Sequence, residues 1–384
     1  MRRLPIALAL ALLLLTILPI PVFAEETDSR GLIEKMPPEY RDFLDRLPEE
    51  LSERLPDGLF SKDGEEVGAA VAEMGDFSFL LRTLLELIGA RLGDCARLLA
   101  TVCGLLLLSS LSSTFSASLK NERIRAAFSL CSTLAVTLAL LSQAGNVLMS
   151  VTDYFAALGG MTKSALPLLG ALYALGGNAG AAAASASGLT VYMTLMEELI
   201  GKSILPFCGI CMGLALIGAL DSGVRLGSLL SSLKKNYTTA LAFLMTLLLA
   251  MLSGQTLLSA RSDTLLWRGA KFAAGNIIPV VGGSVSEMLR TVSTGVGYLR
   301  GVVGVSGVLL LLLMLLPTLV ELLLLRATWQ LSASLAELLG CTAEKKLLDE
   351  FASLLGYLAT AVCICSSILL IAMALLAGCA SAIA

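Results

Sequence analysis

The sequence predicts an all-α protein that crosses a membrane several times, with about six transmembrane helices and two re-entrant or interfacial hairpins rich in Gly and Pro. Its 384 residues are 56% hydrophobic and 15% charged, whereas soluble domains average about 45–50% and about 25%. A helix needs about 20 mostly apolar residues to cross a bilayer. Six uncharged runs approach or exceed this length, at residues 98–119, 126–152, 203–220, 236–260, 301–320 and 351–384.

Composition disfavours an enzyme and a nucleic-acid-binding protein. The chain has no His, the commonest general base and metal ligand. Its formal charge of −3 provides no basic field for nucleic-acid phosphates. Cys208 and Cys211 have the spacing of a redox pair, but no His or adjacent Lys is present to favour a thiolate. The Gly-rich stretches lack the Gly-Lys-Ser/Thr of a P-loop. We therefore expect no catalytic residue, no cofactor, no metal and no nucleic acid.

Residues 1–24 have the pattern of a secretory signal peptide. Arg2 and Arg3 form a basic start, an apolar stretch follows from 4 to 17, and small residues precede a cleavage position after Ala24. An uncleaved membrane anchor is the alternative. In either case, the following segment is exported.

The segment 25–95 is expected to be an exported acidic region of amphipathic helices. Residues 25–66 contain 14 acidic and 6 basic side chains. Their apolar residues recur at helical spacing, and four prolines interrupt the pattern. A segment as short as this rarely folds alone. Its helices therefore need another surface to cover their apolar faces.

Residues 96–155 are expected to form the first transmembrane hairpin. If residue 25 is outside, the first span delivers Lys120, Arg123 and Arg125 to the cytoplasm, in agreement with the positive-inside rule. The second span then returns to the exterior. The later basic loops, near Lys235 and Lys345, are also cytoplasmic if the Gly-rich stretch 164–196 dips into the membrane and returns. The alternative is that this stretch crosses once and every later loop reverses.

An internal duplication is predicted from two short repeats. LPLLG at 166–170 resembles IPVVG at 278–282, and ILP at 204–206 resembles LLP at 315–317, with proline offsets of 112 and 111 residues. The two membrane repeats would occupy 164–260 and 276–384. Gly/Pro-interrupted segments in matching places are typical of a transport pathway, although a rigid bundle without a pore fits equally. The candidate re-entrant or hinge positions are Pro167, Gly170, Pro206, Pro279, Gly282, Gly283 and Pro317.

Four polar residues are candidates for functional positions inside the membrane. Glu198 and Lys202 are four residues apart, which places them on one helical face. Glu321 follows an apolar run and has Arg326 nearby in sequence, and Gln255 lies in the fourth uncharged run. Acidic groups at membrane depth suggest function, but we favour a structural salt link for Glu321 over a role in conduction.

The ordered combination of these features resembles the stage III sporulation protein AE family of endospore-forming bacteria. It comprises the signal, the acidic exported segment, SALPLL at 164–169, Gly254-Gln255 before Asp263, and NIIPVVGG at 276–283. The last motif is the most specific part of the resemblance. The family supplies no catalytic motif to transfer to this chain.

The resemblance implies a multi-pass subunit of the mother-cell membrane around the forespore, with its N-terminal segment in the intermembrane space. Its partners would be membrane lipid, the other stage III A-operon proteins, namely ATPase subunit AA and ring subunits AG and AH, and the stage II sporulation protein Q assembly. Together they would form a secretion-like channel, or feeding tube, that forespore development requires. The competing interpretations are a stand-alone secondary permease, using Glu198, Lys202 and Glu321, and an assembly scaffold without conduction.

Overall fold

The computed structural model describes residues 36–117, 122–175, 187–195, 203–220, 227–250 and 282–381, apart from positions 46, 48, 53, 189, 193, 245, 248 and 249. Every regular element in these ranges is helical. The predicted signal peptide, Glu198, Lys202, Gln255 and Pro279 lie outside the described residues.

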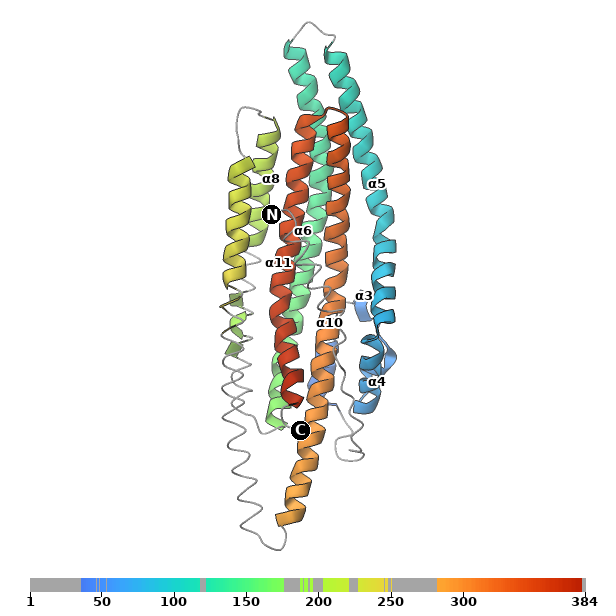
Figure 1. Ribbon diagram of the computed structural model, residues 1–384, viewed down its shortest axis with the longest axis vertical. Coiled ribbons are helices and arrows are strands. Elements are labelled where there is room, and N and C mark those ends of the chain that lie inside the picture. The colour runs from blue at the N-terminus through green and yellow to red at the C-terminus, as the bar shows by residue number, and fades with distance from the viewer. Residues whose placement is uncertain are drawn as a thin grey trace.

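Four long helices form an elongated bundle: α5 (Phe77–Ala117), α6 (Glu122–Leu175), α10 (Gly282–Leu338) and α11 (Thr342–Ser381) (Figure 1). They contain 41, 54, 57 and 40 residues. At a rise of about 1.5 Å per residue they are roughly 60 to 85 Å long, about twice or more the hydrocarbon thickness of about 30 Å. Each helix can therefore cross a bilayer and continue well beyond it.

Among the described residues, these four helices are the ones long and apolar enough to span a membrane. They contain four of the six predicted runs. A fifth run forms α8 (Leu205–Leu220), which is apolar but has only 16 residues. The sixth, 236–260, lies partly outside the described residues. The all-helical membrane character is confirmed, and the count of six spans stays a prediction.

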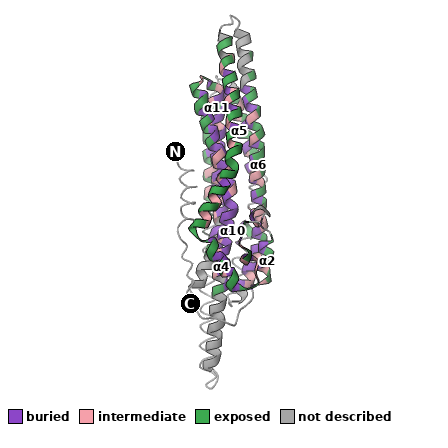
Figure 2. Cartoon of the chain, turned by 90° about the vertical axis from the view of Figure 1, so that its right-hand side faces the viewer, coloured by how far each residue is buried: buried purple, intermediate pink, exposed green. Residues whose placement is uncertain are grey.

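The antiparallel pair α10 and α11 forms the core of the bundle. The most apolar windows of both helices are 72% buried, compared with 22% for α5 and 33% for α6. The two helices join at Gly340, whose φ of 74° lies in the left-handed region that favours glycine. There the amide N–H of Cys341 donates to Ala336 O and that of Gly340 donates to Glu337 O, the hydrogen-bond pattern of a Schellman motif. In Figure 2, buried residues follow the middle of the bundle and exposed residues follow α5.

A layer of short helices covers one part of the bundle. It comprises α2 (Pro38–Leu44), α3 (Glu49–Ser52), the 3₁₀ helix η1 (Asp57–Phe60) and α4 (Gly64–Met74). Helix α2 packs on α6, and α4 packs on α10. The expectation that these amphipathic helices need another surface is confirmed, and the surface is the chain's own bundle.

The apolar side of this layer is fully buried. Tyr40, Phe43, Leu59, Val67 and Met74 are at most 2% exposed. The Tyr40 hydroxyl lies near Ser306 of α10 without a hydrogen bond of standard geometry. Burial raises the pKa of Tyr40 to about 12, so this group is neutral at physiological pH. Seven acidic side chains that the structure describes in this layer are exposed, so its outer side is polar where its inner side is apolar: Asp42, Asp45, Asp57, Asp63, Glu65, Glu66 and Glu73.

The candidate hinge residues that the structure describes lie within helices or at helix ends. Pro167 and Gly170 are inside α6, which continues to Leu175, so the helix runs on through the first part of the predicted hairpin 164–196. Pro317 is inside α10, and Gly282 and Gly283 are the first two residues of that helix. A proline inside a helix removes one backbone hydrogen bond, and packed neighbouring helices allow the helix to continue past it. A hinge role for these positions stays a prediction.

The predicted duplication receives no support from the prolines that the structure describes. Pro206 is the second residue of α8, whereas its proposed counterpart Pro317 lies in the interior of α10. Residues 203 and 204, just before α8, are π-helical, so both prolines lie in helical stretches, and the duplication stays a prediction.

Tight packing around glycine occurs at Gly356 of α11, where a Cβ would lie 2.8 Å from Cζ of Arg326. By contrast, a Cβ at Gly170 would meet no atom within 4 Å. We predict that Gly356→Ala destabilises the protein by about 1–3 kcal/mol because the buried guanidinium must move. Gly170→Ala should be neutral or stabilising by about 0.5–1 kcal/mol. Thermal denaturation in detergent measures both, and equal effects of the two variants would contradict this packing.

Candidate functional site

Among the described residues, carboxylates form three polar centres between helices of the bundle. The first surrounds Glu321 of α10, the second surrounds Glu344 of α11, and the third joins Lys234 to Glu350. Charged side chains are costly in a low-dielectric interior unless they have partners. The identity and separation of their partners therefore decide what each centre can do.

The Glu321 centre joins α5, α6 and α10. The Ser150 hydroxyl of α6 donates a hydrogen bond of 2.9 Å to Glu321 Oε2, and Arg91 Nη2 of α5 lies 3.6 Å from the same oxygen. The Glu321 side chain is 19% exposed and that of Arg91 is 48% exposed. The expected salt link is therefore present, but its cation comes from α5 and not from Arg326. Residues five apart on a helix lie about 140° apart around its axis, so Glu321 and Arg326 face different neighbours.

A pocket of about 560 Å³ opens beside Glu321. Helix α5 contributes Arg91, Asp94 and Arg97 to its wall, and Arg97 Nη1 lies 3.5 Å from Asp94 Oδ1. Its uncharged polar lining consists of Thr101, Ser142, Gln143 and Asn146. The volume lies in the range of small-molecule sites. Two cations, two anions and two carboxamides make it suitable for a polar ligand.

The Glu344 centre joins the beginning of α11 to α5 and α6. The Ser109 and Thr133 hydroxyls donate to Glu344 Oε1 over 2.9 and 3.3 Å. Glu344 is 4% exposed and lies in the first turn of α11. A negative side chain is favourable there because the helix N-terminus carries partial positive charge. This carboxylate therefore fixes the height of α11 relative to its two neighbours.

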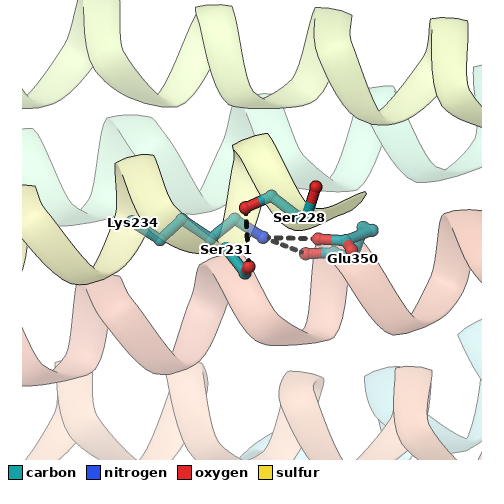
Figure 3. Close-up of polar contacts among 4 residues, drawn as sticks. All are labelled: Ser228, Ser231, Lys234 and Glu350. Atoms are coloured by element: carbon teal, nitrogen blue, oxygen red, sulfur yellow. Dashed lines mark hydrogen bonds and ion pairs between the residues drawn. The ribbon is translucent and has the colours of Figure 1, made fainter. Parts of the chain in front are cut away.

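The third centre is an ion pair between the helical segment 227–244 and α11 (Figure 3). Lys234 Nζ lies 2.8 Å from Glu350 Oε2 and also donates to Glu350 O at 3.1 Å. The Lys234 side chain is 2% exposed and that of Glu350 is 30% exposed. Ser231, one turn before Lys234, donates to Ser228 O in its own helix. The neighbouring Lys235 is exposed.

Arg326 of α10 is buried against α11. It is 8% exposed, its Nε has no hydrogen-bond partner, and its guanidinium occupies the space left by Gly356. Within the described residues, no carboxylate lies within ion-pair distance of it. Packing with α11 therefore replaces the predicted link to Glu321.

Sequence reasoning missed most of these partners. Ser150, Gln143 and Asn146 lie in a run noted only for lacking charge, and their spacing of about one turn was the available signal. Lys234 and Glu350 are 116 positions apart, and nothing local in the sequence distinguishes buried Lys234 from exposed Lys235. Of the four predicted polar positions, Glu321 alone belongs to the described residues.

The three centres connect neighbouring helices through ion pairs and hydrogen bonds, and the Glu321 centre also lines a pocket that could bind a polar ligand. In the described part of the chain, no group of three or more Cys, Asp or Glu side chains is arranged to hold a metal ion. Cys208 and Cys211 are both buried in α8. The arrangement offers ion pairs, hydrogen bonds and the polar pocket beside Glu321.

Comparison with known proteins identifies a family. The sequence pattern of stage III sporulation protein AE matches residues 70–380. The chain is similar to stage III sporulation protein AE of Bacillus subtilis (strain 168), with 28% identity over 209 residues, which are 54% of this chain and 52% of that protein. The match thus spans about half of the relative's length. No solved structure matches the chain.

The buried ion pair gives a test of what holds the segment 227–244 in place. We predict that Glu350→Gln alone destabilises the protein, by up to about 3–5 kcal/mol, because buried Lys234 loses its anionic partner, and that Lys234→Met alone costs less because Glu350 is partly exposed. Replacing both with Met should recover most of this loss, since no unpaired charge remains. Thermal denaturation of the purified protein in detergent measures the effect.

A matched control is the more exposed pair of Lys345 and Glu337, 2.6 Å apart. Neutralising Glu337 should change stability by about 0–1 kcal/mol. Equal losses for the two pairs, or additive losses in the double Met variant, would contradict a structural role for the buried pair.

Proposed function

This chain belongs to the stage III sporulation protein AE family, and from that premise we propose that it is a non-enzymatic membrane subunit of a secretion-like channel between mother cell and forespore. The family match over residues 70–380 is the observation that supports a role in sporulation. The four long apolar helices support a position within a membrane. The proposal adds that the chain acts with other subunits and performs no chemistry of its own.

The distribution of charge supports one orientation. Lys345 and Lys346 follow the α10–α11 turn, and the acidic N-terminal layer packs toward the other end of the bundle (Figure 1). Because Lys and Arg of short loops remain in the cytoplasm, the turn faces the mother-cell cytoplasm. The N-terminal layer then lies in the intermembrane space.

Partners follow from this orientation. The exposed acidic side chains of the N-terminal layer provide a surface for ring subunits AG and AH and the stage II sporulation protein Q assembly. ATPase subunit AA acts from the cytoplasmic end. The apolar residues of the layer are already buried against α6 and α10, so docking uses its charged outer face.

A stand-alone permease is the second candidate, and the pocket beside Glu321 is the observation that favours it. The carboxylate lines a polar space large enough for a small solute. A scaffold without conduction would use the same residues only to hold helices together.

Glu321→Gln separates these interpretations. The amide oxygen still accepts from Ser150, and a partly exposed ion pair is worth only about 0–1 kcal/mol, so a channel subunit should keep its fold, its assembly and nearly normal spore yield. A permease that binds its solute through this carboxylate should lose nearly all activity. Vesicles containing the purified chain alone should show no uptake of amino acids, phosphate or ions. Uptake by wild-type protein that Glu321→Gln abolishes would overturn the channel proposal.

Neutralising the acidic outer face tests the docking surface. Asp42, Asp45 and Glu73 are exposed at the C-terminal ends of their helices, where removing negative charge does not weaken a helix. The triple variant D42N/D45N/E73Q should keep the melting temperature of the wild type but bind ring subunits several-fold more weakly, most clearly at low salt. Co-purification with ring subunits measures this effect.

The control is Tyr40→Ala, which removes a buried ring from the same layer and should destabilise it by about 3–5 kcal/mol. Unchanged partner binding in the triple variant would contradict docking through the acidic face.

A further inference from the structure

We propose that the pocket between α5, α6 and α10 binds the headgroup of a zwitterionic, amine-bearing phospholipid. The pocket contains Arg91, Asp94 and Arg97 on one wall and Glu321 on another, with a volume of about 560 Å³. The inference does not depend on the channel proposal, because it concerns only the lipid contact of this chain.

The height of the pocket on α5 matches a membrane interface. From Leu98 to the end of the helix at Ala117, α5 has 20 residues without a charge, which is about 30 Å, the thickness of the hydrocarbon layer. Arg97 and Asp94 come immediately before this stretch. The charged residues of the pocket on α5 therefore lie at one end of its apolar stretch, as headgroup-binding residues require.

The faces next to the pocket suit acyl chains. Along the same stretch of α5, large apolar side chains are 51–79% exposed, namely Leu107, Leu108, Leu111 and Phe115. Helix α6 exposes Leu134 and Leu138 by 45% and 68%, and its Ala139 and Ser142 line the pocket. A lipid could thus place its headgroup among the polar residues and its tails along these adjoining apolar faces.

The arginines retain hydrogen-bonding capacity for a phosphate. Arg91 is 3.6 Å from Glu321 and Arg97 is 3.5 Å from Asp94, and the described structure gives neither guanidinium a hydrogen bond. Each guanidinium has five N–H donors in a planar fork that matches phosphate oxygens. A phosphate between the two side chains would accept hydrogen bonds from N–H groups that make none in the described structure.

The charge balance of the lining selects the class of headgroup. Two guanidiniums and two carboxylates sum to zero, so the pocket attracts a group carrying both charges more than a purely anionic one. The carboxylates of Glu321 and Asp94 can accept hydrogen bonds from an ammonium, and the side chains of Gln143 and Asn146 can bind the remaining polar atoms. Phosphatidylethanolamine has this combination of an ammonium and a phosphate.

The test uses the full-length purified protein in detergent, titrated with short-chain phosphatidylethanolamine, phosphatidylglycerol, glycerophosphoethanolamine or inorganic phosphate. Binding is measured by native mass spectrometry. We expect phosphatidylethanolamine to bind at least tenfold more tightly than phosphatidylglycerol, with weak binding of both tail-less compounds. Equal binding of phosphate or of the tail-less headgroup would show a soluble-ligand site and overturn the lipid proposal.

Variants of the lining residues test whether phosphatidylethanolamine binds in this pocket. R91Q and R97Q should each weaken phosphatidylethanolamine binding about tenfold, and E321Q should reduce the preference over phosphatidylglycerol. The matched control is R82Q on the same helix, because Arg82 is 82% exposed, pairs with Glu86 and lies outside the pocket. The Arg97 side chain is 86% exposed, so its replacement should leave the fold intact. Unchanged lipid binding in R91Q and R97Q, or an equal loss in R82Q, would overturn the proposal.

Discussion

The main constraint on this structure is that a charged or polar side chain buried between apolar helices must meet a partner. An apolar interface alone tolerates sliding of one helix along another, since one leucine can replace the next. A buried carboxylate needs its specific polar partner, because leaving it unpaired costs several kcal/mol. Glu344 therefore fixes α11 against α5 and α6, Glu321 fixes α10 against the same two helices, and Glu350 fixes α11 against the segment 227–244. These centres set the relative heights of helices that hydrophobicity only brings together.

This constraint also explains which features could be predicted from the sequence. The presence of a salt link at Glu321 follows from the cost of a carboxylate in a membrane, but its partner depends on which helix lies opposite. Arg91 is 230 positions away, on a helix whose contact with α10 has no local signal. The spacing in the sequence argues against Arg326 as the partner of Glu321, because a separation of five residues does not place two side chains on one helical face. Amphipathic periodicity predicted the short N-terminal helices, while their packing on α6 and α10 required the fold.

Hydropathy predicted the long helices but not which of them face lipid. The most apolar part of the chain lies in α10, and its apolar window is 72% buried by protein. Helix α5 contains charged residues in its first half, and yet only 22% of its apolar window is buried. Lipid and protein interior both accept leucine, so an apolar run is consistent with either surrounding. The charges next to the run, such as Arg97, are better markers of the interface because they need water, headgroups or a partner.

The position of the polar groups argues for a subunit over a complete permease. A solute crossing one copy of the chain would need a polar path along the bundle, but α11, at its centre, presents Leu354, Leu355, Leu358 and Val362 to its neighbours, each at most 3% exposed. The pocket beside Glu321 lies at the side of this core, where α5 and α6 meet the surroundings. Within the described residues, the bundle is therefore packed along its axis and polar at its flank. This arrangement supports the proposal that the chain acts together with other subunits.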